Sequence, residues 1–348
     1  MNPYILSGLF FSLGLGTTIT FASSHWLLAW MGLEMNTLSI LPLMAMSHHP
    51  RAVEATLKYF MVQAMAAALI LFASITNACL TGQWDILQTT HYLPLLLITL
   101  ALTLKLGLAP FHTWLPEVLQ GQELSIGLIL STWQKLAPLA LIVQIQPHTP
   151  TIVMGLGVTS ILVGAYGGLD QVLVRKMLAY SSIAHLGWVL VILHVSVPLA
   201  LLALFTYFIM SFSSFLAFKL NFSTNINSLA TAWTKSPALA ALMPLVLLAL
   251  GGLPPLTGFA PKWLILQELT KQEYAPVATA AALAALLSVY FYLRLSYAMT
   301  LTMTPNSLTN TMPWRLPTLQ HTLPLAMSTV ATTTLLPLTP AALALLAP

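Results

Sequence analysis

Four ionisable side chains lie inside long apolar stretches of this sequence, where water cannot readily solvate them. These residues are Glu34, Lys105, Lys135 and Lys262. A charge at the middle of a bilayer costs roughly 3 kcal/mol on insertion scales, so such residues are candidates for function. Burial favours the neutral form of an amine, whereas a nearby carboxylate favours the charged form. One acid and three amines in an apolar medium therefore suggest a proton relay.

The relay has an alternative, in which the same charges form static ion pairs that hold helices together. That interpretation suits Glu34 and Lys105, which can pair with each other, better than it suits the other two lysines. Lys135 and Lys262 have no acidic partner that is evident from the sequence. His185, which follows two serines, could bridge the relay because histidine titrates near neutral pH. It could equally be a hydrogen-bonded packing residue.

Prolines interrupt two of the apolar stretches that carry these lysines. One runs from Lys105 to Pro116 and the other from Gly251 to Trp263. A proline inside a helix leaves the carbonyl four residues earlier without its donor, so Pro110 and Pro255 should free two carbonyls. These are the carbonyls of Leu106 and Gly251. In hydrocarbon a freed carbonyl needs a partner or a wet cavity. The alternative is that both interruptions are ordinary proline kinks.

The composition decides which kind of element carries these residues. The chain of 348 residues is 58% hydrophobic and 6% charged, whereas soluble domains have about 25% charged residues. Apolar side chains must therefore face lipid, and the backbone must satisfy its own hydrogen bonds. The apolar runs have the length of spanning helices and lack the alternation of barrel strands. We predict an all-α integral membrane protein with about eleven spans.

The predicted spans give the chain an internal order. They lie near residues 4–21, 26–46, 60–79, 92–111, 124–145, 152–169, 177–195, 199–220, 238–266, 277–299 and 323–345. The interruptions fall in spans that are an odd number of helices apart, which predicts two inverted five-helix repeats. We place the first repeat at 1–145, the second at 146–299, and a linker with a C-terminal helix at 300–348. Paired broken helices in inverted repeats are typical of transporters.

The loops carry their positive charge on one side of the predicted membrane. The basic residues of that side are Arg51, Lys58, Arg175, Lys176, Lys235 and Arg315. Positive charge marks the inside compartment, so the N-terminus should lie inside and the C-terminus outside. The first fifty residues contain no Lys or Arg. A secretory signal has a basic region and a transit peptide is rich in Arg, so neither is expected here. This favours synthesis within an organelle.

Several kinds of site are not expected. Cys79 is the single cysteine, so an iron–sulfur cluster held by this chain and an internal disulfide are excluded. No glycine-rich phosphate loop follows a strand pattern, and no His, Cys or Asp cluster has the spacing of a metal site. The basic residues are scattered, which argues against a nucleic-acid surface.

The segments discussed above resemble a known family, the antiporter-like membrane subunits of respiratory complex I, which are related to subunits of multi-component sodium/proton antiporters. The resemblance covers the whole chain and is carried by residues 1–3, 30–37, 47–54, 105–117, 177–187 and 251–259. It implies that Glu34 is the acid of the first repeat and pairs with Lys105. Lys135 would be the central relay lysine, and Lys262 the terminal lysine of the second broken helix.

The resemblance further implies a core membrane-arm subunit of proton-translocating NADH:ubiquinone reductase in the mitochondrial inner membrane. Its N-terminus would face the matrix and its C-terminus the intermembrane space. FMN, iron–sulfur clusters and ubiquinone would belong to other subunits, and this chain would hold no cofactor. Expected partners are subunits 4 and 4L, accessory subunits and lipids such as cardiolipin. Bacterial members have additional N-terminal spans, so partner subunits are expected to cover one flank here.

Two other functions remain open at this point. The chain could be a subunit of an independent monovalent cation/proton antiporter, which would use the same charged residues and would show sodium- or potassium-driven exchange in vesicles. It could instead be a structural assembly subunit. That hypothesis predicts that Lys105→Ala leaves proton pumping intact once assembly is restored.

Overall fold

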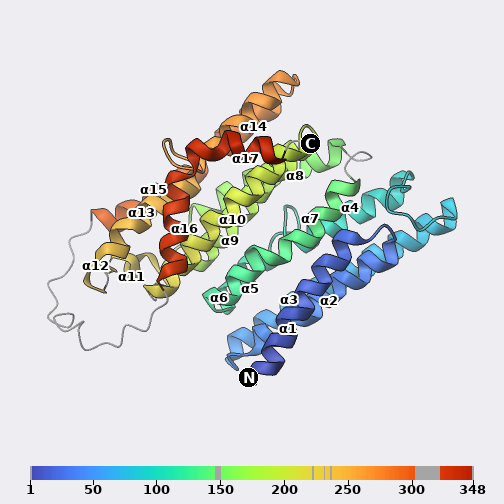
Figure 1. Ribbon diagram of the computed structural model, residues 1–348, viewed down its shortest axis with the longest axis horizontal. Helices are drawn as coiled ribbons and strands as arrows, with labels where there is room; N and C mark the ends of the chain where they lie inside the picture. Colours follow the sequence, from blue (N-terminus) through green and yellow to red (C-terminus); the bar gives the residue numbers. More distant parts are fainter. Residues whose placement is uncertain are drawn as a thin grey trace. The chain divides into compact units, whose positions relative to one another are not determined.

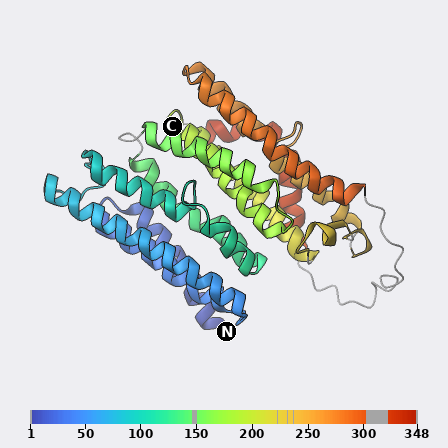
Figure 2. The same cartoon turned by 180° about the vertical axis from the view of Figure 1, so that it is seen from behind.

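The computed structural model describes residues 2–145, 150–221, 223–230, 232–235, 237–301 and 322–346, and nearly all of them are helical (Figures 1 and 2). Within these ranges there is no β-strand, only two isolated bridges that pair His25 with Asp85 and Leu173 with Asn225. The predicted all-α fold is confirmed. The chain divides into two compact units, residues 1–160 and 161–348.

The first unit contains seven helices and the start of an eighth. They are α1 (Pro3–Ala22), α2 (Trp26–Ala45), α3 (Pro50–Thr81), α4 (Tyr92–Leu106), α5 (Trp114–Gly121), α6 (Leu124–Ser131), α7 (Trp133–Ile145) and α8 (Pro150–Gly168). Side chains fix where several of them begin: Asn2, His25 and His49 each accept a hydrogen bond from a backbone N–H of the first turn. Such caps satisfy donors that a helix start leaves free.

The second unit is built around α9. Its helices are α9 (Val174–Leu193), α10 (Val197–Leu220), α11 (Ile226–Ala230), α12 (Ala232–Lys235), α13 (Pro237–Gly251), α14 (Phe259–Lys271), α15 (Ala275–Thr300), α16 (Leu323–Thr334), the short 3₁₀ helix η4 (Leu336–Leu338) and α17 (Thr339–Leu346). Most of α9 is buried, and α10 packs against α9, α13, α14 and α16. The predicted linker of residues 300–322 lies almost wholly outside the described residues.

The described part of the chain contains eight helices long and apolar enough to span a membrane, or nine if α16 and α17, bent by 69°, count as one span. This is a multi-pass membrane protein, but eleven spans are not confirmed. The reason lies in the interruptions: α4 and α13, which begin the two broken spans, have only 15 residues each. They are shorter than the roughly 20 residues that span a bilayer.

α3 is longer than the predicted span of residues 60–79. It has 32 residues and is therefore about 48 Å long at 1.5 Å per residue, whereas the hydrocarbon core is about 30 Å thick.

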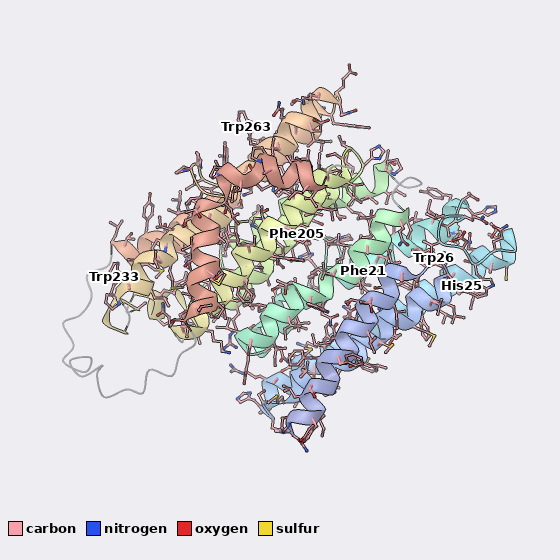
Figure 3. All side chains as sticks on the ribbon, in the orientation of Figure 1. Phe21, His25, Trp26, Phe205, Trp233 and Trp263 are labelled. Carbon is pink, nitrogen blue, oxygen red and sulfur yellow. The ribbon has the colours of Figure 1, made fainter. Side chains whose placement is uncertain are left out.

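Two tryptophans differ in environment: Trp26 is fully buried at the start of α2, whereas Trp263 on α14 is exposed (Figure 3). Only the second can act as an interfacial anchor.

The two broken segments end their first helices in the same way. Gly107 and Gly252 follow the last residues of α4 and α13 with φ of 73° and 80°. The backbone N–H of the residue after each glycine donates to a carbonyl of the last helical turn: Leu108 to Thr103, and Leu253 to Leu248. Glycine tolerates this left-handed conformation, which is typical of helix C-termini. Each helix therefore ends at its glycine, before the proline is reached.

The remainder of each break also corresponds. Pro110 and Pro255 follow the glycines at the same distance, both in cis peptide bonds. The chain resumes a helix at Trp114 in one case and at Phe259 in the other, again at the same distance. The two breaks thus share the glycine conformation, the cis proline and the distance to the next helix.

Candidate functional site

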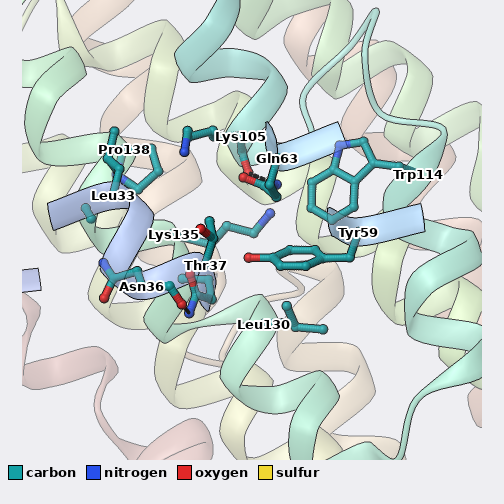
Figure 4. A pocket seen from close by; sticks show the side chains of 12 residues that line it. Leu33, Asn36, Thr37, Tyr59, Gln63, Lys105, Trp114, Leu130, Lys135 and Pro138 are labelled. Atoms are coloured by element: carbon teal, nitrogen blue, oxygen red, sulfur yellow. Dashed lines mark hydrogen bonds between the residues drawn. The ribbon is translucent and has the colours of Figure 1, made fainter. Parts of the chain in front are cut away.

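The first candidate site is a small cavity in the first unit, with about 10 Å³ of water-accessible space, enough for about one water molecule. Figure 4 shows it between α2, α3, α4 and α7. Its polar lining residues are Asn36, Thr37, Tyr59, Gln63, Lys105, Gln134 and Lys135, and the indole of Trp114 closes one wall. The structure therefore brings two of the predicted relay lysines, Lys105 and Lys135, to one cavity although they are on different helices.

Lys135 reaches the first break from α7. Its side chain is 1% exposed, and its amine donates a hydrogen bond to the carbonyl of Leu106, the last residue of α4. The amine also lies 5.7 Å from the centre of the Trp114 ring, within the range of a cation–π interaction. The Leu106 carbonyl, which was predicted to lose its helical donor, thus accepts a hydrogen bond from a lysine.

Lys105 lies in the last turn of α4 and is 5% exposed. Its amine has no hydrogen-bond partner among the described residues. The backbone carbonyl of Lys105, in contrast, accepts a hydrogen bond from the Gln63 side-chain amide at 3.4 Å. A buried polar group without a partner costs free energy, so this amine is available to bind water or to exchange a proton.

Glu34 is close to these lysines without forming an ion pair. No salt bridge joins it to Lys105 among the residues that the structure describes. Its carboxylate instead accepts a hydrogen bond from the Thr37 hydroxyl at 3.2 Å. It is near enough to interact electrostatically with Lys105 and with Tyr59. A locked ion pair of Glu34 with Lys105 is therefore not what this structure contains.

The second candidate site lies in the second unit, around Lys262. This residue stands in the first turn of α14, and its amine donates to the carbonyl of Gly251 at 2.7 Å. The amine packs directly on the glycine that ends α13: a Cβ atom at Gly252 would lie 2.9 Å from it. As in the first unit, a lysine donates a hydrogen bond to the carbonyl of the last residue of the broken helix.

His185 and Lys262 line the same small cavity, which has about 10 Å³ of water-accessible space, enough for about one water molecule. The imidazole is 9% exposed and stacks on Tyr207, with ring centres 5.4 Å apart. Lys262 is close enough to act on it electrostatically. The described residues that line this cavity include no Asp or Glu, so the two basic groups have no acidic neighbour there.

Other features were not foreseen from the sequence. The predicted span 124–145 divides at Thr132, which separates α6 from α7 and places Lys135 near a helix start. Trp114 binds the helix end, donating from its indole to the Leu104 carbonyl at 3.2 Å. Asn36 is 2% exposed, and its side-chain amide has no partner among the described residues. The only sequence signal for these features is that Asn36 and Thr132 are polar residues within apolar segments.

A separate group of charges lies away from both cavities. Lys58 on α3 contacts two carboxylates, Glu54 at 2.9 Å and Glu117 at 2.8 Å. All three side chains are well exposed, and the spacing of Glu54 and Lys58 is that of a helical ion pair. In the part of the chain that the structure covers, no three His, Cys, Asp or Glu side chains are arranged to hold a metal ion.

Comparison with protein families gives two matches that together cover nearly the whole chain. The family described as the transmembrane part of NADH:quinone oxidoreductase and Mrp antiporters matches residues 23–288. The family described as the C-terminus of NADH dehydrogenase subunit 2 matches residues 289–343.

Individual proteins agree with these matches. The NADH-ubiquinone oxidoreductase chain 2 of Tetraodon nigroviridis is 65% identical over 345 residues, 99% of each chain, and that of Gadus morhua is 64% identical over 346 residues, again 99% of each. A chain of respiratory complex I from Thermus thermophilus superposes with a TM-score of 0.85 and 27% identity over 97% of this chain and 79% of its own. A chain of the Mrp complex from a Dietzia species, 16% identical, shares the fold with a TM-score of 0.84 over 97% of this chain and 76% of its own.

Proposed function

The chain belongs to the family of NADH:quinone oxidoreductase and Mrp antiporter membrane subunits, and we propose that it moves protons across a membrane through its two lysine sites. Its relatives are named NADH-ubiquinone oxidoreductase chain 2, and it acts as a membrane subunit of that proton-translocating enzyme. Electron transfer from NADH to ubiquinone takes place on other subunits, which hold the FMN and the iron–sulfur clusters. This chain contributes proton-binding groups.

One observation carries the proposal: in each unit, a lysine amine donates to the carbonyl that a broken helix leaves without a partner. A hydrogen bond from a charged donor is roughly twice as strong as one between neutral groups. Protonation of the amine therefore tightens the contact, and loss of the proton weakens it. A weakened contact leaves the carbonyl open to water, which can then carry the next proton.

In the first site we assign one proton to a pair of amines. Lys105 and Lys135 line the same cavity, and like charges in a low-dielectric site disfavour each other. Glu34 adds a negative charge near Lys105, which favours a single protonated amine. The proton would pass between the amines through water bound to the cavity side chains, among which Asn36 and Gln63 supply donors and acceptors.

In the second site the proton resides on Lys262, with His185 as the group that exchanges it. The two share a cavity and interact electrostatically. Among the described residues that line this cavity, Lys262 is the only lysine, and its amine is also the donor to the break carbonyl. Transfer of the proton from Lys262 therefore weakens its contact with the Gly251 carbonyl at the same time.

We place the chain in the mitochondrial inner membrane, with its N-terminus in the matrix and its C-terminus in the intermembrane space. This orientation is supported by the loop pattern of the sequence, which predicts Arg51, Arg175 and Lys176 on one side of the membrane. The two repeats would cover 1–145 and 146–299. Subunits 4 and 4L, accessory subunits and cardiolipin are the proposed neighbours.

The test is a set of matched lysine substitutions in the assembled enzyme. Lys105→Met, Lys135→Met and Lys262→Met are compared with Lys58→Met, which removes an exposed lysine of the same chain. We expect the first three to lower the proton-to-electron ratio while the complex assembles and Lys58→Met behaves as wild type. Unchanged NADH oxidation and an unchanged ratio in all three would rule out the relay.

The shared fold with a chain of the Mrp complex keeps one alternative in view, a subunit of a monovalent cation/proton antiporter. Vesicles that contain the purified enzyme distinguish the two functions. Proton uptake that requires NADH and is indifferent to sodium and potassium supports the redox-driven pump. Exchange driven by a sodium or potassium gradient without NADH supports the antiporter.

A further inference from the structure

Each broken segment is tied by a side-chain hydroxyl to a helix that follows it in the chain. In the first unit the Ala109 N–H donates to the Ser160 hydroxyl of α8 at 3.1 Å, and this hydroxyl donates to the Leu156 carbonyl at 2.6 Å. In the second unit the Thr257 hydroxyl donates to the Thr332 carbonyl of α16 at 2.7 Å. In both links the broken segment is the donor; the hydroxyl belongs to the following helix in the first unit and to the break in the second.

The acceptor in the second unit is a carbonyl that its own helix cannot use. Thr332 lies in the last turn of α16, where the final carbonyls have no donor within the helix. The chain bends by 69° immediately afterwards, at a segment that contains Pro337, which has no N–H. Thr332 is fully buried and Thr257 is 3% exposed, so bulk water is kept from this carbonyl and the threonine hydroxyl is its donor.

The link lies close to the lysine site along a short and well-connected segment. From Gly251 to Phe259 the backbone is held by successive turn bonds, including Leu256 N–H to the Leu253 carbonyl and Phe259 N–H to the Leu256 carbonyl. Gly258 packs against the Ala249 carbonyl of α13. Displacement of Thr257 therefore moves the segment that presents the Gly251 carbonyl.

We propose that Thr257 is a positioning residue for Lys262, acting through its hydrogen bond to the Thr332 carbonyl. The bond fixes the second break so that the Gly251 carbonyl meets the Lys262 amine, and it makes the bend between α16 and α17 part of this site. The effect on proton transfer rests on the function proposed above, whereas the effect on the rigidity of the break does not.

The test compares three substitutions in the assembled enzyme in lipid vesicles. Thr257→Val keeps the shape but removes the hydroxyl, and Thr257→Ser keeps the hydroxyl. Thr329→Val is the matched control, because the Thr329 hydroxyl is buried in α16 and bonds only the Ala326 carbonyl of its own helix at 3.0 Å. Hydrogen exchange of the amides of residues 251–259 and the proton-to-electron ratio are measured in each.

We expect Thr257→Val to raise exchange in the break about tenfold, as the loss of a buried hydrogen bond does, and to lower the proton-to-electron ratio. Thr257→Ser should restore both, and Thr329→Val should change neither. If Thr257→Val does not assemble, Thr257→Cys replaces it, since a thiol is a weaker donor, and the same direction is expected.

The outcomes separate this inference from the relay. Wild-type exchange and ratio in Thr257→Val, with a lowered ratio in Lys262→Met, would overturn the positioning role and leave the relay intact. If Lys262→Met leaves the ratio unchanged, Lys262 has no part in proton transfer, and the exchange measurement alone decides whether Thr257 holds the break. Faster exchange confined to Thr257→Val then supports the link, and equal exchange in all variants overturns it.

Discussion

The two broken helices have the same backbone but receive their lysines from different places. In the first unit the carbonyl of Leu106 is held by Lys135, which belongs to α7, a separate helix. In the second unit the carbonyl of Gly251 is held by Lys262, on the helix that begins directly after the break. The first contact therefore depends on packing between helices, whereas the second is local to one segment.

The surroundings of the two amines also differ. The first cavity contains a second amine, Lys105, near the carboxylate of Glu34. The second contains His185 and no acidic lining residue among those described. The first site can keep a proton while its break contact changes, because another amine is available. In the second site, loss of the proton weakens the break contact directly, so this site should be the less tolerant of substitution.

The largest expected effect is that of arginine at position 262. Arginine keeps the charge but does not release its proton in proteins. Lys262→Arg should slow proton transfer through the second site at least tenfold, within the range of general acid–base effects, whereas Lys135→Arg should slow the first site less because Lys105 remains. The measurement is the proton-to-electron ratio during NADH oxidation. Full activity in Lys262→Arg would mean that only the charge is needed.

Alanine at the two glycines that end the broken helices should have the next largest effect. Both have positive φ, 73° and 80°, so a side chain costs about 1–2 kcal/mol at either position. In addition, a Cβ at Gly252 would displace the Lys262 side chain, whereas one at Gly107 would meet the Trp114 ring at 3.1 Å. Thermal unfolding should show similar losses of stability. The proton-to-electron ratio should fall further in Gly252→Ala, and an equal fall in both would remove this distinction between the sites.

A smaller effect is expected from the aromatic wall of the first site. Trp114 lies 5.7 Å from the Lys135 amine, and a cation–π contact of this kind is worth about 1 kcal/mol, or roughly fivefold in an equilibrium. Trp114→Phe keeps a ring and should retain more proton transfer than Trp114→Leu. The pH dependence of pumping checks this, because loss of the ring favours the neutral amine and should shift the profile to lower pH. Identical profiles for the two variants would exclude the interaction.

The smallest effect is expected at Lys58, outside both sites. Its ion pairs with Glu54 and Glu117 are exposed, and exposed ion pairs contribute little to stability. Lys58→Met should leave the proton-to-electron ratio unchanged and make thermal stability less dependent on salt. A clear loss of pumping would show that this charged group belongs to the proton path.

Much of this arrangement can be predicted from residue types. The four charges in apolar segments identify Glu34 and the three lysines as candidates. The prolines identify the two carbonyls that accept hydrogen bonds from lysine amines in the structure. Helical character follows from composition. The sequence does not show that Gly107 and Gly252, rather than the prolines, end the two helices.

The pairing of amines with carbonyls is less accessible, because it depends on tertiary packing. Nothing local indicates that Lys135 rather than Lys105 holds the Leu106 carbonyl, since this requires α7 to pack against α4. The link from Thr257 to Thr332 joins residues 75 positions apart. The count of eleven spans is not confirmed for a related reason: hydropathy measures apolar length along the sequence and does not show that α4 and α13 end after 15 residues.

The most direct test of the account is a density map of the assembled enzyme, resolved to ordered water, in its resting state and during NADH oxidation. We predict water between Lys105 and Lys135 and beside Lys262 in both states. During turnover, a fraction of molecules should show the Leu106 and Gly251 carbonyls released from their lysines and bound to water. Dry cavities, with both amine–carbonyl contacts unchanged in all states, would contradict proton transfer by these lysines.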